Sequence, residues 1–469
     1  MTPQIATVLC VLAMLALYHL DRGEGERTSQ ALWLPVVWVS ITASRMLSEW
    51  LAIVGFTYGT TSADLSDRLL EGSPLDRLLL TALVAFSVIV LLNRGRKVGT
   101  ILRANAPIVI FILYCAVSVL WSDFPAVSFK RWIKSAGDVA MVLIVLTDPN
   151  PSAAVKRLLV RVGFLLVPAS VLVNKYYPEL GRQWSPWGGA SFTGVTTGKN
   201  ELGGICLLFG LGFMWRFLQG LRCAGGTRRT GLLIAHSALL AMVIWLFWKA
   251  NTVTALSCFV MGSVLILMTG SSLVARRLWI VHLLVLAMLS VSLSALFLDA
   301  GAGVVQTLGR DPSLTGRTPL WNLVLSMTGN QLLGTGFESF WLGPRLDHIW
   351  SVYWWHPNEA HNGYIEVFLN LGWVGVALLG LLIVTGYRNV VAAIRRDPEN
   401  GKLRLAYFVA ALAYNITESA IRIMHPIWIL FLLATMAVPG GWAVASPTGL
   451  SQETSASHSL QDVPLLTEV

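Results

Sequence analysis

The most conspicuous shortage in this 469-residue sequence is charge. Asp, Glu, Lys and Arg together make up only 13% of the residues, whereas 55% are hydrophobic and the mean hydropathy is +0.65. A soluble domain needs a charged surface around its core, and this chain has too few charges to cover one. Apolar runs of about 17–25 residues, each long enough to cross a bilayer, explain the excess. The composition therefore predicts an all-α polytopic membrane protein.

Residue patterns of several enzyme and pump classes are also missing. There is no P-loop, which excludes an ATP-driven pump, and no Gly-x-Ser-x-Gly elbow or His-Glu-x-x-His helix. The five cysteines are scattered without a Cys-x-x-Cys pair and are interpreted as small core residues. No Asp-x-Asp or other clustered carboxylate site stands at the predicted outer face. We therefore expect no metal site, no metal-bound nucleotide sugar and no cofactor there.

Thirteen apolar runs predict helices and about 12 or 13 membrane crossings, over residues 3–20, 31–56, 78–93, 104–121, 133–147, 157–173, 201–218, 230–248, 254–272, 278–298, 361–385, 404–418 and 424–441. Basic residues cluster within 93–103, 155–161, 216–229, 275–277 and 387–404. Two apolar runs lie between successive clusters, so all five can face the same side. The positive-inside rule makes that side the cytoplasm. Since the net charge of +9 is explained by these loops, no nucleic-acid partner is expected.

This threading predicts four regions. Residues 1–298 form N-terminal transmembrane helices, 299–360 form one large periplasmic loop, 361–441 form C-terminal transmembrane helices, and 442–469 form a disordered cytoplasmic tail. The loop is far longer than most connections in compact folds. It contains five tryptophans, Trp321, Trp341, Trp350, Trp354 and Trp355. Aromatic side chains at this density suit the membrane interface or the face of a sugar ring, so we expect the function there.

Charged side chains collect on the predicted outer side, against the positive-inside trend. They include Arg45, Arg131, Lys199, Lys249, Arg310, Arg317, Glu338, His361 and Glu418. Ionisable groups at membrane depth are costly and usually mark function. An anionic ligand at the outer leaflet is the simplest reason for the basic excess, because a guanidinium matches phosphate oxygens with its fork of donors. A lipid pyrophosphate has the right depth.

Ordinary structural roles stay open for several of these residues. Arg310 and Arg345 could be loop charges. Lys199 and Lys249 could be interfacial anchors, whose ammonium groups reach out of the membrane. His361 could simply cap a helix, although the neighbouring Asn362 would serve that role as well.

Three stretches in the second half of the chain carry a resemblance to a known family. They are "TGRTPLW" (315–321), "GTGFESFW" (334–341) and "AHNGYIEVFLNLGWVG" (360–375). In this order they resemble the signature block of the O-antigen ligase and Wzy-type polysaccharide polymerase superfamily. Earlier pieces, including "GVTTGKNELGG" (194–204) and "KANTVTAL" (249–256), are similar to its exopolysaccharide-production branch. The resemblance extends from about residue 40 to residue 440.

The resemblance implies a metal-independent, inverting glycosyltransferase of the GT-C type. Such a protein lies in the bacterial inner membrane as a multi-pass protein with its active site facing the periplasm. It takes a glycan from undecaprenyl diphosphate, so the implied partners are an undecaprenyl-diphosphate-linked oligosaccharide and the lipid bilayer, with a chain-length regulator and a flippase beside them. The acceptor is another lipid-linked repeat in a polymerase and lipid A-core in a ligase.

Carried onto this chain, the essential arginine and histidine of the family correspond to Arg317 and His361. In the scheme that follows, Arg317 holds the pyrophosphate and His361, with a reference pKa near 6.5, takes the acceptor's hydroxyl proton. Glu338 or Glu418 orients the histidine. The substrate-binding set comprises Arg310, Lys199, Lys249, Asn362, Glu418, Arg45, Arg131 and Trp341, the tryptophan stacking on sugar.

Two rival functions are compatible with a charged helical membrane protein. A transporter or flippase for lipid-linked glycans would also use many helices, but such transporters commonly have repeated halves. No repeat is evident here, and the polar residues gather at one face. A non-catalytic partner in a polysaccharide assembly complex would tolerate loss of Arg317 and His361. Between polymerase and ligase, the variants "KNELGG" and "TGRTPLW" favour a polymerase.

Overall fold

The computed structural model describes residues 1–21, 27–53, 55, 72–184, 189–222, 225–270, 277–297 and 317–440. The predicted tail, 442–469, therefore lies outside the described residues. So does Arg310, together with the first part of the predicted large loop.

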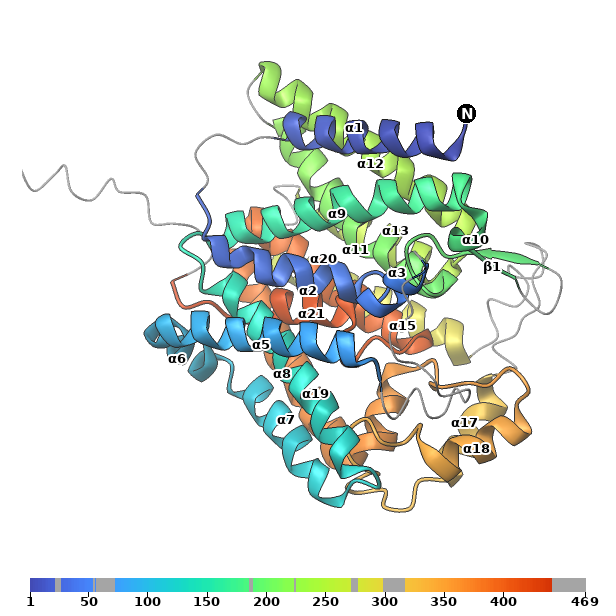
Figure 1. The fold of residues 1–469 in the computed structure, drawn as a ribbon. Helices are drawn as coiled ribbons and strands as arrows, with labels where there is room; N and C mark the ends of the chain where they lie inside the picture. The colour runs from blue at the N-terminus through green and yellow to red at the C-terminus, as the bar shows by residue number, and fades with distance from the viewer. Residues whose placement is uncertain are drawn as a thin grey trace, which may run out of the picture.

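Helices dominate the described chain, which confirms the all-α prediction (Figure 1). All thirteen predicted ranges contain helix. The helices are α1 (Pro3–Leu20), α2 (Trp33–Thr42), α3 (Leu47–Ile53), α5 (Pro74–Asn93), α6 (Gly95–Ala104), α7 (Ala106–Val117), α8 (Pro125–Leu146), α9 (Pro151–Tyr176), α10 (Pro178–Gly181), α11 (Lys199–Arg222), α12 (Thr227–Ala250), α13 (Val253–Thr269), α15 (Leu278–Phe297), α17 (Arg317–Ser326), α18 (Gly343–Val352), α19 (Gly363–Arg396), α20 (Pro398–Thr417) and α21 (Pro426–Thr435). Two short antiparallel strands, β1 (Arg182–Trp184) and β2 (Ala190–Phe192), pair Arg182 with Phe192.

Six described helices are long and apolar enough to cross a membrane, namely α1, α5, α9, α11, α12 and α19. Two bent pairs, α2 with α3 (61°) and α6 with α7 (91°), raise the number to eight. This is a multi-pass membrane protein, but the number is below the expected 12 or 13. The difference has two causes. The apolar helices α13 and α21 are short, as is the apolar stretch Leu278–Ser294 of α15, and α8 and α20 carry charged side chains inside their length.

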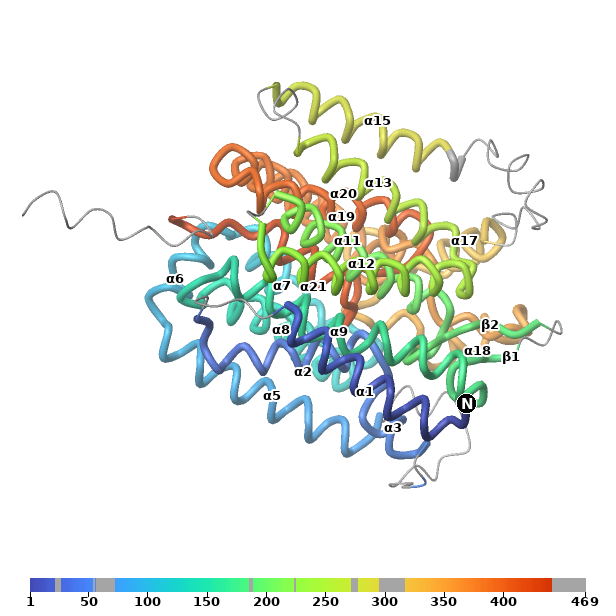
Figure 2. The backbone as a smooth tube through the Cα atoms, turned by 90° about the horizontal axis from the view of Figure 1, so that it is seen from above, coloured from blue at the N-terminus to red at the C-terminus, as the bar shows by residue number. Residues whose placement is uncertain are grey.

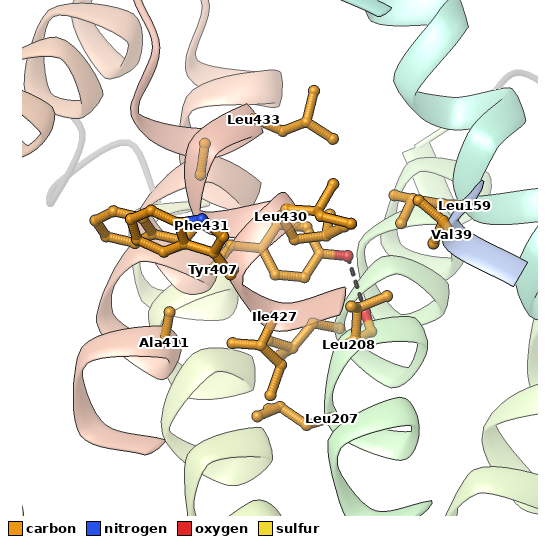
Figure 3. Close-up of a cluster of buried hydrophobic side chains, with 14 of the residues drawn as sticks. Val39, Leu159, Leu207, Leu208, Tyr407, Ala411, Ile427, Leu430, Phe431 and Leu433 are labelled. Carbon is orange, nitrogen blue, oxygen red and sulfur yellow. Dashed lines mark hydrogen bonds between the residues drawn. The ribbon is translucent and has the colours of Figure 1, made fainter. Parts of the chain in front are cut away.

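The core lies where α20 and α21 pack against α9 and α11. Every residue of α20 from Gly401 to Ile416 is buried, as expected of a helix that is surrounded by others. Figure 3 shows how Tyr407 enters this cluster beside Ile427 and Leu430 and donates a hydrogen bond of 2.9 Å to the carbonyl of Leu208. Figure 2 shows α5 and α15 at opposite edges, and both expose large apolar side chains that suit contact with lipid.

The predicted inner and outer connections lie at opposite ends of the molecule. At one end, Trp215 of α11 donates to the carbonyl of Glu399 over 2.7 Å. At the other, Arg45 donates to the carbonyl of Leu180 over 2.7 Å, and Asn200 donates to Glu418 over 3.0 Å. Figure 1 shows α6 near the first end and β1, α17 and α18 at the second. That the second end faces the periplasm is a prediction from the basic loops.

Helix α19 is broken at Gly372, which has φ 62° and ψ −164°. The segment 330–336 of the large loop runs along this break and shares its hydrogen bonds. Trp373 N donates to the Gln331 carbonyl (2.9 Å), and Gly336 N donates to the Asn370 carbonyl (2.9 Å). These hydrogen bonds at the break fix the segment 330–336 against α19. Glu338 and Trp341, which come directly after this segment, are thereby held at the outer end.

Replacement of Gly372 by alanine is expected to destabilise the protein. A backbone with φ 62° and ψ −164° is essentially restricted to glycine and costs another residue roughly 1–3 kcal/mol, and a Cβ at this position would overlap the Leu332 carbonyl. The thermal midpoint of the purified protein in detergent should fall by a few degrees. Gly380→Ala on the same helix is the matched control, because a Cβ there has no atom within 4 Å. Equal midpoints for the two variants would contradict the account of the break.

Candidate active site

A chain of alternating charges joins three segments at the outer end. Arg317, the first residue of α17, lies 3.4 Å from Glu418, which follows α20. Glu418 lies 3.5 Å from Nδ1 of His361, and that nitrogen is 2.9 Å from Glu359. The other oxygen of Glu359 accepts a hydrogen bond of 2.5 Å from Arg422. The order is thus Arg317, Glu418, His361, Glu359 and Arg422, with three potential positive and two negative charges.

Asn362, not His361, caps α19. Its side-chain oxygen accepts from Tyr364 N and Ile365 N, at 3.0 and 3.1 Å, and its amide donates to the Ile416 carbonyl at 2.9 Å. Asn362 therefore has the capping role that the sequence left open for His361. His361 itself has a left-handed backbone with φ 51°, and it directs its ring toward Glu359 and Glu418.

The second segment is shaped by Asn415 near the end of α20. Its side-chain oxygen accepts from Ala420 N (2.9 Å) and Ile421 N (2.8 Å), which turns the chain immediately after Glu418. The Glu418 carbonyl in turn accepts from Gly363 N (3.1 Å), so the end of α20 and the start of α19 are tied together. These bonds position Glu418 next to His361.

The ion pairs set the protonation state of His361. Burial alone would lower the pKa of this histidine, but the hydrogen-bonding contacts and negative charges of Glu359 and Glu418 outweigh burial and raise the pKa to about 9. Burial likewise would raise the pKa of Glu359, but the charge of Arg422 and the contact with His361 lower it to about 2. The pKa of Arg422 is raised, chiefly by Glu359. The 2.9 Å contact of His361 is an ion pair without the angle of a good hydrogen bond.

A cavity of about 1160 Å³ lies beside the charged chain. Apolar side chains of α2, α3 and α5 form part of its wall. Its charged lining consists of Arg77, Lys130, Arg131, Lys134 and Arg422 with Glu49, Asp76, Glu201 and Glu338. A second cavity of about 60 Å³ is lined by Glu359 and shares Glu338, Trp341, Asn358, Arg422 and Ile423 with the first. The larger cavity thus combines an apolar wall with a charged lining of five basic and four acidic side chains next to the ion pairs.

The other predicted site residues divide into two groups. Arg131, Glu338 and Trp341 line the large cavity. Arg131 donates to the backbone carbonyl of Glu338. The buried indole of Trp341 donates to Glu366 at 2.9 Å. Glu338, unlike Glu418, has no recorded contact with His361; its carboxylate accepts weakly from Ile423 N over 3.5 Å.

The second group makes contacts outside the charged chain or is exposed. Lys249 lies over the ring of Trp248, 4.1 Å from its centroid. Arg45 binds the Leu180 carbonyl and lies over Trp50 at 5.6 Å. Lys199 is exposed at the first position of α11, where its role as an anchor or a ligand stays open.

Two residues of the charged chain of ion pairs, Glu359 and Arg422, were not predicted from the sequence. Glu359 stands two residues before His361 in "NEAHNGY", and Arg422 lies in the short predicted outer connection between the last two apolar runs. The position of Arg422 could have marked it as a candidate site residue, because a basic residue in an outer connection runs against the positive-inside trend.

Glu359, His361 and Glu418 also offer three ligand atoms within 4.8 Å of one another. A divalent ion there would compete with Arg317 and Arg422, which already neutralise the two carboxylates. The donor set therefore fits an ion-pair chain better than a metal centre, and the expected absence of a metal stays a prediction.

A multi-pass helical membrane protein with a charged cluster beside a large cavity is the class that the fold and site define. No protein-family model matches the chain. It is similar to the exopolysaccharide production protein ExoQ of Rhizobium meliloti (strain 1021), with 23% identity over 334 residues, 67% of this chain and 72% of that protein. The similarity supports the predicted resemblance to the exopolysaccharide branch of the O-antigen ligase and Wzy-type superfamily.

The raised pKa of His361 makes stability depend on pH. The folded protein holds this proton more tightly than the unfolded chain, whose histidine has a pKa near 6.5. The stabilisation is therefore fully present below about pH 6.5 and is lost as the pH rises through about 9. The thermal midpoint of the wild type should fall more steeply from pH 7 to pH 10 than that of His361→Gln. His348→Gln, at an exposed position of α18, should keep the wild-type slope; equal slopes for all three proteins would refute the pairing.

Proposed function

We propose that this protein transfers glycan from a polyprenyl-diphosphate-linked donor to an acceptor hydroxyl at the outer face of the bacterial inner membrane, and that it polymerises exopolysaccharide repeats. One observation carries the proposal. Arg317 and His361, which the resemblance implies as the essential pair, are 44 residues apart in sequence and meet on the same carboxylate, Glu418. The similarity to an exopolysaccharide production protein supports the same class of substrate.

The cavity suits such a donor by its chemistry. A polyprenyl diphosphate has an apolar tail and a diphosphate that carries several negative charges. Apolar side chains of α2, α3 and α5 would contact the tail, and the cationic lining around Arg131, Lys134 and Arg422 would attract the diphosphate. Loss of the glycan leaves additional negative charge on the diphosphate oxygen, where preorganised cations stabilise a transition state by several kcal/mol.

The electrostatics of the site modify the role of His361. A histidine with a pKa of about 9 is neutral in only about one molecule in a hundred at pH 7. The assignment of His361 as general base assumed the reference pKa near 6.5, whereas Glu359 and Glu418 raise the pKa of His361 to about 9. In the ion-pair chain, His361 acts with Arg317 as a positive charge beside the large cavity, although neither residue lines it. A carboxylate then has to accept the proton of the acceptor.

Inversion at the anomeric carbon follows if the acceptor oxygen displaces the diphosphate in one step. The same site could join the glycan to lipid A-core, which would make the protein a ligase. A flippase for lipid-linked glycans would use the cavity as a path and would not need Arg317 and His361 to break a bond. These alternatives predict different products and are separated by the product analysis below.

Loss of either member of the essential pair should abolish polymer formation. In a strain that lacks the gene, Arg317→Ala or His361→Ala at matched expression is expected to reduce long polymer at least about 100-fold, because a preorganised charge on the leaving group is lost. Single lipid-linked repeats should accumulate on the outer leaflet, as a membrane-impermeant label applied before extraction, followed by gel and mass analysis, would show.

Arg345→Ala and His348→Ala are matched controls in the same loop. Arg345 pairs with Asp123 at 2.7 Å, away from the charged chain, and His348 is exposed. Both controls should restore normal polymer. Normal polymer from the Arg317 and His361 variants would refute the catalytic role, and repeats retained on the cytoplasmic leaflet would indicate a flippase.

Polymer formation should not require a divalent metal. Arg317 and Arg422 already occupy the carboxylates that a metal would need. Membranes washed with excess EDTA and supplied with lipid-linked repeats are expected to form polymer at the untreated rate. A loss that Mg²⁺ or Mn²⁺ restores would instead assign a metal to Glu359, His361 and Glu418.

A further inference from the structure

Arg422 is the member of the ion-pair chain that lines the large cavity. Its guanidinium lies 2.5 Å from Glu359, and the residue lines both the large and the small cavity. Its side chain is 35% exposed, which is more than that of any other member of the chain. An anion in the large cavity can therefore reach Arg422 without first displacing Arg317 or His361.

Glu359 is placed where an acceptor hydroxyl could meet it. Its side chain is 14% exposed and lines the small cavity, which shares Arg422 and Asn358 with the larger one. At rest, Glu359 is a poor base because Arg422 and His361 neutralise it and hold its pKa at about 2. Removal of the Arg422 charge would raise its affinity for a proton.

The two carboxylates predicted to orient His361, Glu418 and Glu338, are less suited to this exchange. Glu418 lines neither cavity, and it is held by Asn200 at 3.0 Å and by Arg317 at 3.4 Å. Glu338 lines both cavities but has no recorded contact with His361. Only Glu359 is bound both to His361 and to a cation that an anion in the cavity can reach.

We propose that a diphosphate in the large cavity draws Arg422 away from Glu359, and that the released carboxylate accepts the proton of the acceptor hydroxyl. This inference rests on the proposed glycosyl transfer. The acceptor oxygen forms its bond to the anomeric carbon, and the bond from that carbon to the diphosphate oxygen breaks. The diphosphate leaves with the electron pair and stays bound to Arg422. When it departs, Arg422 returns to Glu359 and the proton is released to water.

The exchange couples proton transfer to the presence of a donor. Without a diphosphate, Arg422 remains on Glu359 and neutralises this carboxylate. Arg422 binds the diphosphate in this scheme, and Glu359 is the catalytic base.

The test compares binding with turnover for Glu359→Gln in the purified full-length chain, with farnesyl diphosphate as the soluble probe. Because the variant lacks the competing carboxylate, farnesyl diphosphate should bind about three- to tenfold more tightly than to the wild type. Polymer formation from lipid-linked repeats should fall at least about 100-fold, since the base is gone. Asp123→Asn, which loses the carboxylate of a pair with Arg345 at the same end, should change neither quantity.

The proposal thus predicts that Glu359→Gln binds the probe more tightly and turns over more slowly. A merely structural role of Glu359 would instead weaken both binding and turnover. Weaker binding or wild-type turnover for Glu359→Gln would overturn the proposal and leave glycosyl transfer intact. If Glu359→Gln does not fold, the charge-balanced double variant Glu359→Gln/Arg422→Gln replaces it. That variant should bind the probe at least tenfold more weakly than the wild type and form no polymer; wild-type polymer would overturn the proposal. Absence of probe binding by the wild type would instead count against the proposed function itself.

Discussion

The ion pairs at the outer end are the constraint on which the site depends. Charges that are removed from water are stable only when partners surround them, and each carboxylate here stands between two cations. Satisfying all five groups at once fixes the start of α17, the segment before α19 and the segment after α20. These segments lie up to 105 residues apart between Arg317 and Arg422, so one local electrostatic requirement organises a large part of the fold.

The hydrophobic frame holds this arrangement in place. The buried helix α20 carries Glu418 at its end. The Asp138 carboxylate of α8 accepts from Trp38 Nε1 (2.8 Å) and from Met424 N (2.9 Å), which anchors the segment that carries Arg422. The break at Gly372 holds the segment that leads to Glu338 and Trp341, which line the cavity. Packing in the membrane region thus determines the geometry of polar groups outside it.

Hydropathy alone was enough to predict all thirteen helical ranges, because an apolar run in lipid has little alternative to a helix. It did not predict the bend between α6 and α7 or the break at Gly372, which lies in a continuous apolar run and depends on hydrogen bonds to residues 330–336. The motifs led to Arg317, His361, Glu418 and Glu338. Lys249, which the sequence left open as an interfacial anchor or a ligand, lies over an aromatic ring. The partners Glu359 and Arg422 were missed, because residue type and spacing do not specify which charges meet across 63 residues.

The most direct test of glycosyl transfer is reconstitution of the purified chain in liposomes with lipid-linked repeats extracted from a strain that lacks the gene. The account predicts a ladder of lipid-linked products that differ by one repeat, formed without other proteins or metal and with inverted configuration at the new linkage. Repeats that cross the bilayer but stay single would contradict it and identify a transporter instead.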